Sequence, residues 1–525
     1  MNAALRRCEP ALAAALGALQ TLAFVPALAG FAPLTPLAPL SPLLPLLPIA
    51  TLAWLVGRLD QATPRRAALL GWCYGTAWLG AGVWWLFISM HRYGGLPAPL
   101  AAGAVFALSA ALSLYLAAAA AAYARWRRGR AADALLFAAL WLLAELARGI
   151  IFTGFPWLAA GYSQIDSVLA ALAPWLGVYG MGAVMAALAV GAVQLLRSRG
   201  RQWRAAAATA LLLVAALATP ANFTQPTGEI TVALLQSNVR QDEKFAAERL
   251  PESLAWVARE MMAAQADLVL APETAVPLLP FQLQDFAPGY WAMLQAHFAV
   301  PGRAALVGVP LGDFERGYTN SVLGLSAAGA GYRYDKWHLV PFGEFIPTGF
   351  RWFTEMMNIP LGDFSRGVLN PPSFAVGGQR VGPNICYEDL FGEELAQRFG
   401  DAAQAPTVLA NISNIGWFGD TIAIPQHLNI SRLRTLELQR PMLRATNTGA
   451  TAVIDHRGRV VAELAPHTRG VLLARVQGRQ GVTPFAWWAA RFGVWPLWAG
   501  AALVVLALSR GRPGPAEPAG PAARA

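Results

Sequence analysis

Charged residues and cysteines are both scarce in this chain of 525 residues. Charged side chains make up 13% of it, against about 25% in a soluble globular protein, whereas hydrophobic residues make up 56% and the mean hydropathy is +0.42. This deficit of charge argues against an ordinary soluble enzyme and indicates membrane spans. The cysteines, Cys8, Cys73 and Cys386, exclude a disulfide framework, because two of them lie in or beside apolar runs.

Acidic residues are fewer than basic ones, which leaves a net charge of +10. A charge of this sign could indicate a nucleic-acid partner. The arginines, however, stand in clusters between apolar runs rather than on one soluble face, so the sequence predicts no nucleic-acid partner.

The apolar runs are concentrated at the two ends of the chain. Residues 10–57 contain no charged residue, which is room for two spans at about 20 residues each. Six further spans are expected at 67–90, 97–124, 132–151, 168–196, 205–219 and 492–509. The sequence therefore predicts about eight spans, seven of them in an N-terminal domain over 1–220 and the last within 485–509.

Arginine clusters at residues 6–7, 58–66, 125–130, 197–204 and 510–512 separate these runs. With eight spans, all the clusters fall on one side of the membrane. Cytoplasmic loops carry the excess of Lys and Arg, so both termini are expected in the cytoplasm and residues 221–484 outside. The first apolar stretch, which follows Arg6 and Arg7 and reaches Ala27-Leu28-Ala29, also resembles a cleavable signal peptide. Cleavage there would leave the remaining topology unchanged.

Residues 225–475 have a different pattern, in which charges are dispersed and short β-type runs alternate with helical ones. Helices, both amphipathic, are expected at 254–264 and 428–438, and strands at 230–236, 268–271, 304–309, 381–385 and 407–412. This alternation predicts one layered α/β domain outside the membrane. The tail at 511–525 is rich in Pro, Ala and Gly and is expected to be disordered.

Three side chains in this region carry the chemistry. Cys386 ends an apolar strand and is the only cysteine in the outer domain, Glu273 ends a second strand, and Lys336 stands among aromatic residues. Each is a weak signal alone, since a free cysteine is most often a buried small hydrophobe and a strand-end glutamate often only caps a helix. A nucleophilic thiol also needs a base or a lowered pKa.

Taken together, Glu273, Lys336 and Cys386 resemble the Glu–Lys–Cys set of the nitrilase, or carbon–nitrogen hydrolase, superfamily. The membrane part narrows this resemblance to the apolipoprotein N-acyltransferase family. The segments that carry it are Phe-Thr-Gly-Phe-Pro-Trp at 152–157, Gly-Tyr-Ser-Gln at 161–164, the Val-Pro-Phe-Gly-Glu core at 340–344, Asn-Ile-Ser-Asn at 411–414, Trp-Phe-Gly at 417–419 and residues 437–446. The chain departs from the family pattern at two places, the pair Ile415-Gly416 and the single residue Phe245.

The resemblance implies a fold, an activity and substrates. The outer domain should be an α-β-β-α sandwich facing the periplasm of a bacterial inner membrane. Its thiol should accept an acyl chain from a phospholipid, with phosphatidylethanolamine favoured, and pass it to the N-terminal amine of a diacylated apolipoprotein. No metal, nucleotide or other cofactor is expected, and the protein is expected to be a monomer.

The resemblance also implies supporting residues. Glu344 would hold Lys336, Glu388 would position the nucleophile loop, and the backbone N–H of Tyr387 would serve the oxyanion. Substrate or lid contacts are expected from Phe245, Phe350, Trp352, Phe353, Trp417, Glu437 and Arg440. The aromatic loop at 345–364 fits either a lipid-dipping lid or a loop packed on its own core.

Three questions stay open at the level of sequence. Glu145 and Arg148 can pair on one helical face, either to contact lipid headgroups or as a structural ion pair. A membrane-tethered amidase that hydrolyses small amides would use the same triad. A non-catalytic lipoprotein-binding module would use only the fold, although no triad residue is lost here.

Overall fold

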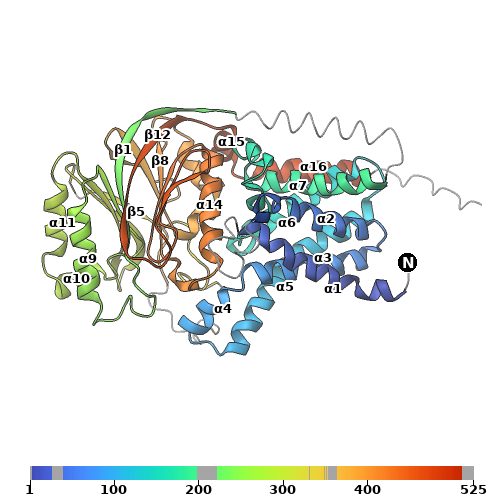
Figure 1. Cartoon of the computed structure of the whole chain (residues 1–525), viewed down its shortest axis with the longest axis horizontal. Coiled ribbons are helices and arrows are strands. Elements are labelled where there is room, and N and C mark those ends of the chain that lie inside the picture. Colours follow the sequence, from blue (N-terminus) through green and yellow to red (C-terminus); the bar gives the residue numbers. More distant parts are fainter. Residues whose placement is uncertain are drawn as a thin grey trace, which may run out of the picture.

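The chain forms a helical bundle and a two-sheet domain that pack against each other (Figure 1). A computed structural model describes residues 3–25, 39–197, 221–329, 331–347, 349–350, 352 and 363–510. The expected span at 205–219, lid residue Phe353 and the tail at 511–525 lie outside the described residues.

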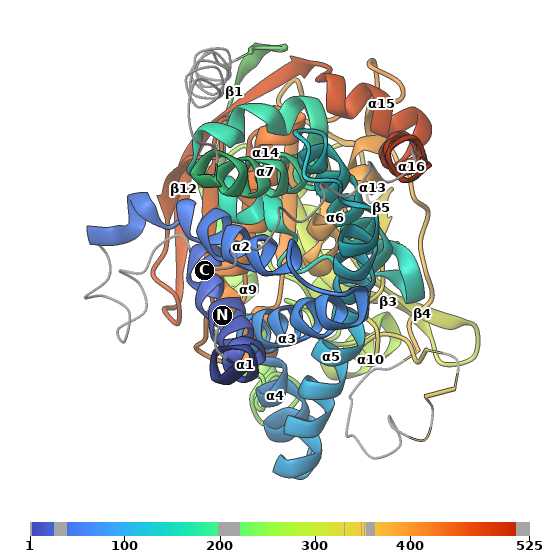
Figure 2. The same cartoon turned by 90° about the vertical axis from the view of Figure 1, so that its right-hand side faces the viewer.

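The helices of the bundle run side by side (Figures 1 and 2). They are α1 (Ala3–Gln20), α2 (Leu46–Leu59), α3 (Pro64–Gly82), α5 (Ala98–Trp126), α6 (Asp133–Ile150), α7 (Ala173–Arg197) and α16 (Trp495–Ser509). Among the described residues, three helical stretches are long and apolar enough to cross a membrane: Ala98–Trp126, Asp133–Thr153 and Val168–Arg197. These helices support a membrane domain, whereas the expected number of eight spans remains a prediction.

Several of the apolar runs that were expected to span the membrane are not single continuous helices. The stretch expected at 67–90 breaks where α3 ends at Gly82, and it continues as the short α4 (Leu86–Ile88) and a π-helical turn, Ser89–Tyr93. At the C-terminal end, α15 (Pro484–Phe492) meets α16 at a bend of 91°. Hydropathy alone does not register such breaks, because apolar residues continue through both.

Small residues allow close helix packing in the bundle. A Cβ added at Gly17 of α1 would lie 2.1 Å from the main-chain oxygen of Tyr74 in α3, and one at Gly71 would lie 2.8 Å from the Cβ of Ala120 in α5. The Tyr74 hydroxyl is buried here, 2.7 Å from Gln20 and 2.9 Å from Thr51. Backbones that approach this closely gain dispersion contacts, which hold helices together where no hydrophobic effect acts between them.

The second domain is built on two six-stranded sheets. The first sheet has the order β12 (Gly470–Gly481), β1 (Thr224–Gln236), β2 (Leu268–Ala271), β3 (Ala304–Asp313), β4 (Gly317–Ser326), β5 (Tyr332–Asp335). The second has the order β11 (Val460–Glu463), β10 (Ala452–Ile454), β9 (Met442–Thr446), β8 (Val408–Ser413), β7 (Gln379–Ile385), β6 (Phe374–Val376). The central strands β1–β2–β3 and β7–β8–β9 run parallel, so their carboxyl ends lie at common edges. All five expected strands are confirmed, although β1 begins six residues before its expected start and β3 ends four residues beyond its expected end.

Alternation along the strands builds two cores. In β1, Val232 and Leu234 point into the core between the sheets, whereas Ala233 and Leu235 face the core under the outer helices. This follows from the period of two in a strand, which turns successive side chains to opposite faces. Helices α9 (Leu250–Ala263), α10 (Pro280–Phe286) and α11 (Tyr290–Phe298) cover the first sheet on the side away from the bundle (Figure 1).

Helix α14 (Ala423–Leu438) lies between the second sheet and the membrane helices (Figure 1). The expectation of an amphipathic helix here is wrong, because both of its faces are covered and side chains such as Gln426, Asn429 and Arg434 are buried among other elements. The short α13 (Gly392–Ala396) lies on the same side. The domain is thus an α-β-β-α sandwich whose inner helical layer touches the bundle.

We predict that Gly17→Ala destabilises the protein. The added methyl group must move the backbone of α3, and overpacking of this kind typically lowers stability by about 1–3 kcal/mol. Thermal unfolding in detergent should show a lower Tm. Gly103→Ala in α5 is the matched control, because a Cβ there meets nothing within 4 Å. An equal Tm for both variants would contradict the packing of α1 on α3.

Candidate active site

Three strand ends bring the candidate catalytic side chains together. Glu273 follows β2 by two residues, and Lys336 and Cys386 directly follow β5 and β7. The Nζ atom of Lys336 lies 3.7 Å from Oε1 of Glu273. Cys386 lies at the neighbouring strand end, where the charges of Glu273 and Lys336 act in opposite directions on the pKa of its thiol.

Glu273 is held as a buried carboxylate by donors on both of its oxygens. Oε1 accepts a hydrogen bond from the Asn320 amide at 2.7 Å, and Oε2 accepts one from the backbone N–H of Asn414, also at 2.7 Å. The side chain is 7% exposed. A carboxylate that accepts fixed hydrogen bonds keeps a defined direction, which a general base needs.

Lys336 is a fully buried ammonium between two carboxylates. It lies 2.9 Å from Glu344, which also accepts hydrogen bonds from Asn320 and from the backbone N–H of Val340. Burial would lower the pKa of Lys336, but Glu344 and Glu273 overcome it and raise this pKa above its ordinary value. The side chain is therefore a permanent positive charge in a site of low dielectric.

Cys386 opens the 3-10 turn Cys386–Leu390 and has a φ of +51°. Few residues other than glycine adopt this left-handed conformation, and it is typical of strained functional positions. Burial, with the negative charge of Glu273, raises the pKa of its thiol to about 12, against the lowering effect of Lys336. Burial and the charge of Glu273 thus favour the neutral thiol over the thiolate in the resting site.

Glu388 joins the nucleophile turn to the loop after Lys336. Its oxygens accept hydrogen bonds from the backbone N–H groups of Ile385 at 2.6 Å and Trp337 at 2.7 Å, and from the hydroxyl of Tyr334. Burial raises the pKa of this carboxyl group. The expected supporting residues Glu344 and Glu388 thus each contact one of the two catalytic loops.

Two residues of the membrane domain's Phe-Thr-Gly-Phe-Pro-Trp segment contact the site. The hydroxyl of Tyr387 donates to the carbonyl oxygen of Gly154 at 3.1 Å, and Nε2 of His338 lies 3.1 Å from that of Thr153. The ring of His338 stacks on Phe391 with centroids 3.5 Å apart. The nucleophile turn and the lysine loop therefore both contact the bundle.

Several residues of the site were not expected from the sequence. Asn320 bridges Glu273 and Glu344, and nothing in its local sequence marks it. Lys244 is buried and donates to the main-chain oxygen of Glu273 at 2.9 Å. Burial lowers its pKa to about 8, although Glu273 and Cys386 act to raise it. Asn414 lies in a motif that resembles the family, which was the available signal.

The expected lid residues fall into two groups. Phe350 and Trp352 are exposed, at 45% and 61%, and Trp417 is half-buried, edge-on to Tyr93 of the π-helical turn. Phe245 is also half-buried, in the turn that follows β1. These four side chains are partly accessible, as a substrate contact requires.

The expectation that Glu437 and Arg440 contact substrate is wrong, because both side chains are buried in structural contacts. Gly177 kinks α7 with a φ of +66°, and Glu437 accepts the N–H of Val178 that this kink leaves free. Arg440 donates to the carbonyl oxygens of Pro406 and Gly481, both at 2.6 Å. Neither side chain has exposed surface for a substrate.

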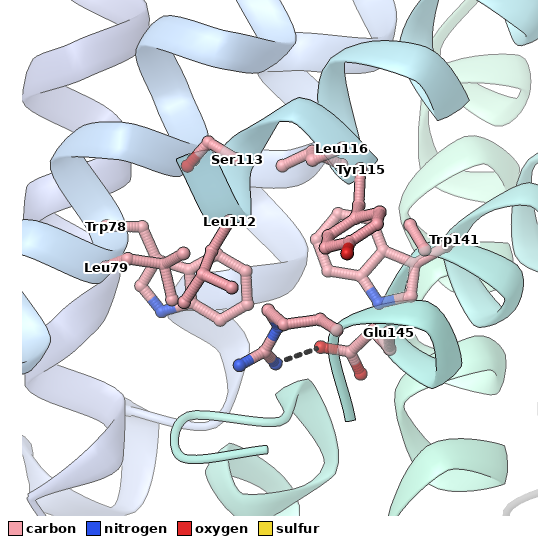
Figure 3. Close-up of a pocket in the computed structure, with 11 residues that line it drawn as sticks. Trp78, Leu79, Leu112, Ser113, Tyr115, Leu116, Trp141 and Glu145 are labelled. Atoms are coloured by element: carbon pink, nitrogen blue, oxygen red, sulfur yellow. Dashed lines mark hydrogen bonds and ion pairs between the residues drawn. The ribbon is translucent and has the colours of Figure 1, made fainter. Parts of the chain in front are cut away.

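Glu145 and Arg148 form a buried ion pair of 3.1 Å in α6 (Figure 3). Arg148 also donates to the carbonyl oxygens of Phe155 and Trp157, and Glu145 accepts from the N–H of Ala160. The pair lines a small, partly open pocket between α3, α5 and α6. Its contacts favour the structural reading, in which it fixes the segment that reaches the active site.

The stacked sheets with a carboxylate, an ammonium and a thiol at their strand ends define a hydrolase-type α/β domain of the nitrilase class. A family profile described as carbon-nitrogen hydrolase matches residues 231–484. A second profile, the apolipoprotein N-acyltransferase N-terminal domain, matches residues 16–191. The chain belongs to the apolipoprotein N-acyltransferase family.

Relatives support this membership over nearly the whole chain. An apolipoprotein N-acyltransferase of Verminephrobacter eiseniae is 55% identical over 84% of this chain and 87% of its own length. One from Ralstonia nicotianae is 47% identical over 97% of this chain and 95% of its own length. A solved CN-hydrolase superfamily protein from Xanthomonas campestris is 20% identical over 51% of this chain and 96% of its own, with a TM-score of 0.37.

We predict opposite effects of Glu273→Gln on thiol reactivity and on acyl transfer. In a Cys8→Ser, Cys73→Ser background, alkylation of Cys386 by iodoacetamide should rise about tenfold per pH unit from pH 7 to 10, because the thiol pKa is about 12. Removing the carboxylate charge should move this rise to lower pH. Acyl transfer should nevertheless fall by ~100- to 10,000-fold, because the general base is lost. An unchanged alkylation profile in the variant would contradict the proximity of Glu273 and Cys386.

Proposed function

We propose that this protein transfers an acyl chain from a phospholipid to the N-terminal α-amine of the S-diacylglyceryl cysteine of apolipoproteins, by way of a thioester on Cys386. The observation that carries the proposal is the convergence of a neutral thiol, a carboxylate and a buried ammonium in one site. Phosphatidylethanolamine is the favoured donor. Family membership supports the lipid and lipoprotein substrates.

In the first half-reaction, Glu273 takes the proton of the thiol while sulfur attacks the ester carbonyl of the lipid. Negative charge develops on the carbonyl oxygen and is stabilised by the ammonium of Lys336 and by the backbone N–H of Tyr387. The tetrahedral intermediate then expels the alkoxide of the lysophospholipid. This leaving group takes the proton from Glu273, and the acyl chain remains on sulfur.

In the second half-reaction, the neutral amine of the acceptor attacks the thioester. Glu273 accepts a proton from the attacking nitrogen, and the same two donors hold the oxyanion. The C–S bond breaks, the proton returns to sulfur, and the amide product leaves. The lysophospholipid departs before the acceptor binds, so the kinetics should be ping-pong.

The supporting residues have positioning roles in this scheme. Glu344 keeps Lys336 charged and aimed at the site through its 2.9 Å contact. Glu388 holds the backbone next to Cys386 and the backbone after Lys336 at once, which sets the distance between nucleophile and ammonium. Phe245, Phe350, Trp352, Phe353 and Trp417 are proposed to contact the lipid chains.

A lipid substrate explains why the domain sits on a helical bundle. Moving an acyl chain out of the bilayer into water costs ~0.8 kcal/mol per CH₂ group, so the site must open at the membrane surface. We place the enzyme, as a monomer, in the bacterial inner membrane with the sandwich in the periplasm and both termini in the cytoplasm. The domain limits remain those of the sequence: bundle 1–220, catalytic domain 225–475, last span within 485–509 and a cytoplasmic tail.

The alternative is an amidase that hydrolyses small amides with water as the acceptor. The triad fits it equally well. It gives no reason for two loops of the site to contact a membrane bundle through Tyr387 and His338.

We predict that Cys386→Ser and Cys386→Ala form no thioester and no triacylated product with phospholipid and a diacylated lipopeptide. Intact-mass measurement of native protein incubated with phospholipid alone should show one added acyl chain. Lipopeptide acylation that persists in Cys386→Ala would refute the mechanism. Free fatty acid without amide product from the native protein would support the amidase.

We also predict the orientation of the two domains. Ala327 lies on an exposed turn of the sandwich, and Ala131 lies on an exposed loop of the bundle. Each is replaced by cysteine, as Ala327→Cys or Ala131→Cys, in a Cys8→Ser, Cys73→Ser, Cys386→Ser background. A membrane-impermeant maleimide should label the first in intact spheroplasts and the second only after permeabilisation. The reverse pattern would place the active site in the cytoplasm.

A further inference from the structure

The main-chain carbonyl of Cys386 is held by two buried side chains that the catalytic scheme does not use. Nδ2 of Asn411 donates to this oxygen at 3.1 Å, and Nε2 of His427 lies 3.2 Å from it. Asn411 belongs to β8, whose register places it beside Asn384 of β7, and His427 belongs to α14. Side chains from two separate elements therefore bind the backbone carbonyl of Cys386.

These two contacts act on Cys386, whose backbone is in a strained conformation. A non-glycine residue held in the left-handed region costs about 1–3 kcal/mol and persists only where its surroundings fix it. The φ of +51° at Cys386 sets where its side chain points, and the carbonyl group belongs to the same residue. Two hydrogen bonds on that carbonyl offset the strain and oppose rotation of the peptide that follows.

The hydrogen bonds around His427 also determine its tautomer. Nδ1 lies 3.2 Å from the guanidinium of Arg444, which can only donate, so Nδ1 accepts. Nε2 then carries the proton and faces two acceptors, the Cys386 oxygen and Oδ1 of Asp389 at 3.0 Å. The side chains of His427, Arg444 and Asp389 are 0–1% exposed. Although burial would raise the pKa of Asp389, His427 and Arg444 lower it, which keeps the carboxylate ionised.

The membrane domain covers the other side of this imidazole. The indole of Trp157 stacks on His427 with centroids 5.5 Å apart and planes inclined by 26°. Its Nε1 donates to Oε1 of Gln426 at 2.9 Å, and Trp85 donates to the same oxygen at 3.1 Å. Gln426 in turn donates to the carbonyl of Gly82 at the end of α3. His427 is thus fixed from the sandwich and from the bundle.

We propose that His427 and Asn411 are positioning residues, which keep the thiol of Cys386 in line with Glu273 and Lys336 by holding the nucleophile's own carbonyl. Asp389 and Arg444 orient the imidazole, and Trp157 makes this orientation depend on the membrane domain. The inference rests on the proposed function, since it assigns the two residues to the thioester-forming step.

The test compares a variant that retains the donor with one that removes it, in the Cys8→Ser, Cys73→Ser background. His427→Gln keeps an N–H near the position of Nε2, whereas His427→Leu has a side chain of similar size and no donor. Asn411→Asp is isosteric and removes the second donor. His297→Gln, on α11 at the far side of the sandwich, is the matched control (Figure 1). Acyl-enzyme formation from phospholipid is followed by intact mass and expressed per folded molecule.

We expect His427→Leu and Asn411→Asp to lower the rate of acyl-enzyme formation by about 100-fold, the effect of a nucleophile displaced by about 1 Å. The KM for phospholipid should stay unchanged, because both residues are buried and offer no surface to a lipid. His427→Gln should recover most of the rate, and His297→Gln should behave as native protein. Native rates in the folded fraction of His427→Leu and Asn411→Asp, or no recovery in His427→Gln, would overturn the proposal.

A second readout separates this inference from the proposed function. Alkylation of Cys386 by iodoacetamide at fixed pH needs no lipid and should be slower in His427→Leu and Asn411→Asp than in His427→Gln. If native protein takes up no acyl chain from phospholipid, the proposed function fails, while the alkylation series still tests the two contacts on the carbonyl of Cys386. Equal alkylation in all four variants would overturn the positioning role by itself.

Discussion

A buried positive charge, the ammonium of Lys336, is the constraint on which the catalytic domain depends. An isolated charge in a protein interior is strongly unfavourable, so carboxylates must accompany it. Glu344 lies 2.9 Å away and Glu273 3.7 Å away, and Asn320 donates to both. These contacts tie the end of β2, the strand β4 and the loop after β5 to one point. The thiol of Cys386 lies in the field of that cluster, where Lys336 favours its ionised form and Glu273 opposes it.

The same cluster connects the two domains. Glu388 joins the nucleophile turn to the backbone at Trp337 and His338, and His338 reaches the carbonyl of Thr153 in the bundle. The segment around residues 153–157 is itself held by the ion pair of Glu145 and Arg148. A chain of polar contacts therefore runs from a membrane helix to the nucleophile. This arrangement fixes the position of the site relative to the helical bundle.

The sequence was sufficient for most local elements and for the choice of the three candidate catalytic residues, which stays a prediction. The strand at 268–271 is a short apolar run, and the side chains that follow β2 and β7 reach the sheet edge because parallel strands end together. The sequence predicted a helix within α14 but not its surroundings. Both domains cover this helix, and hydropathy does not tell which elements pack against a helix. Glu437 and Arg440 were expected at the substrate surface for a similar reason. Their role depends on a kink at Gly177 and on carbonyl groups far away in the chain.

What the sequence by itself determined is the apolar character of the helical part, the position of a separate α/β domain and the choice of Glu273, Lys336 and Cys386 as candidate catalytic residues. Composition, run length and strand-end placement are local properties that the order of residues carries directly. The tertiary structure alone decided which neighbours tune these groups. Asn320, Lys244, Asn411 and His427 meet the triad from four separate elements, and no periodicity links their positions to it. Hydrogen bonds reach only about 3 Å, so such partners become visible only when the folded chain brings distant residues together.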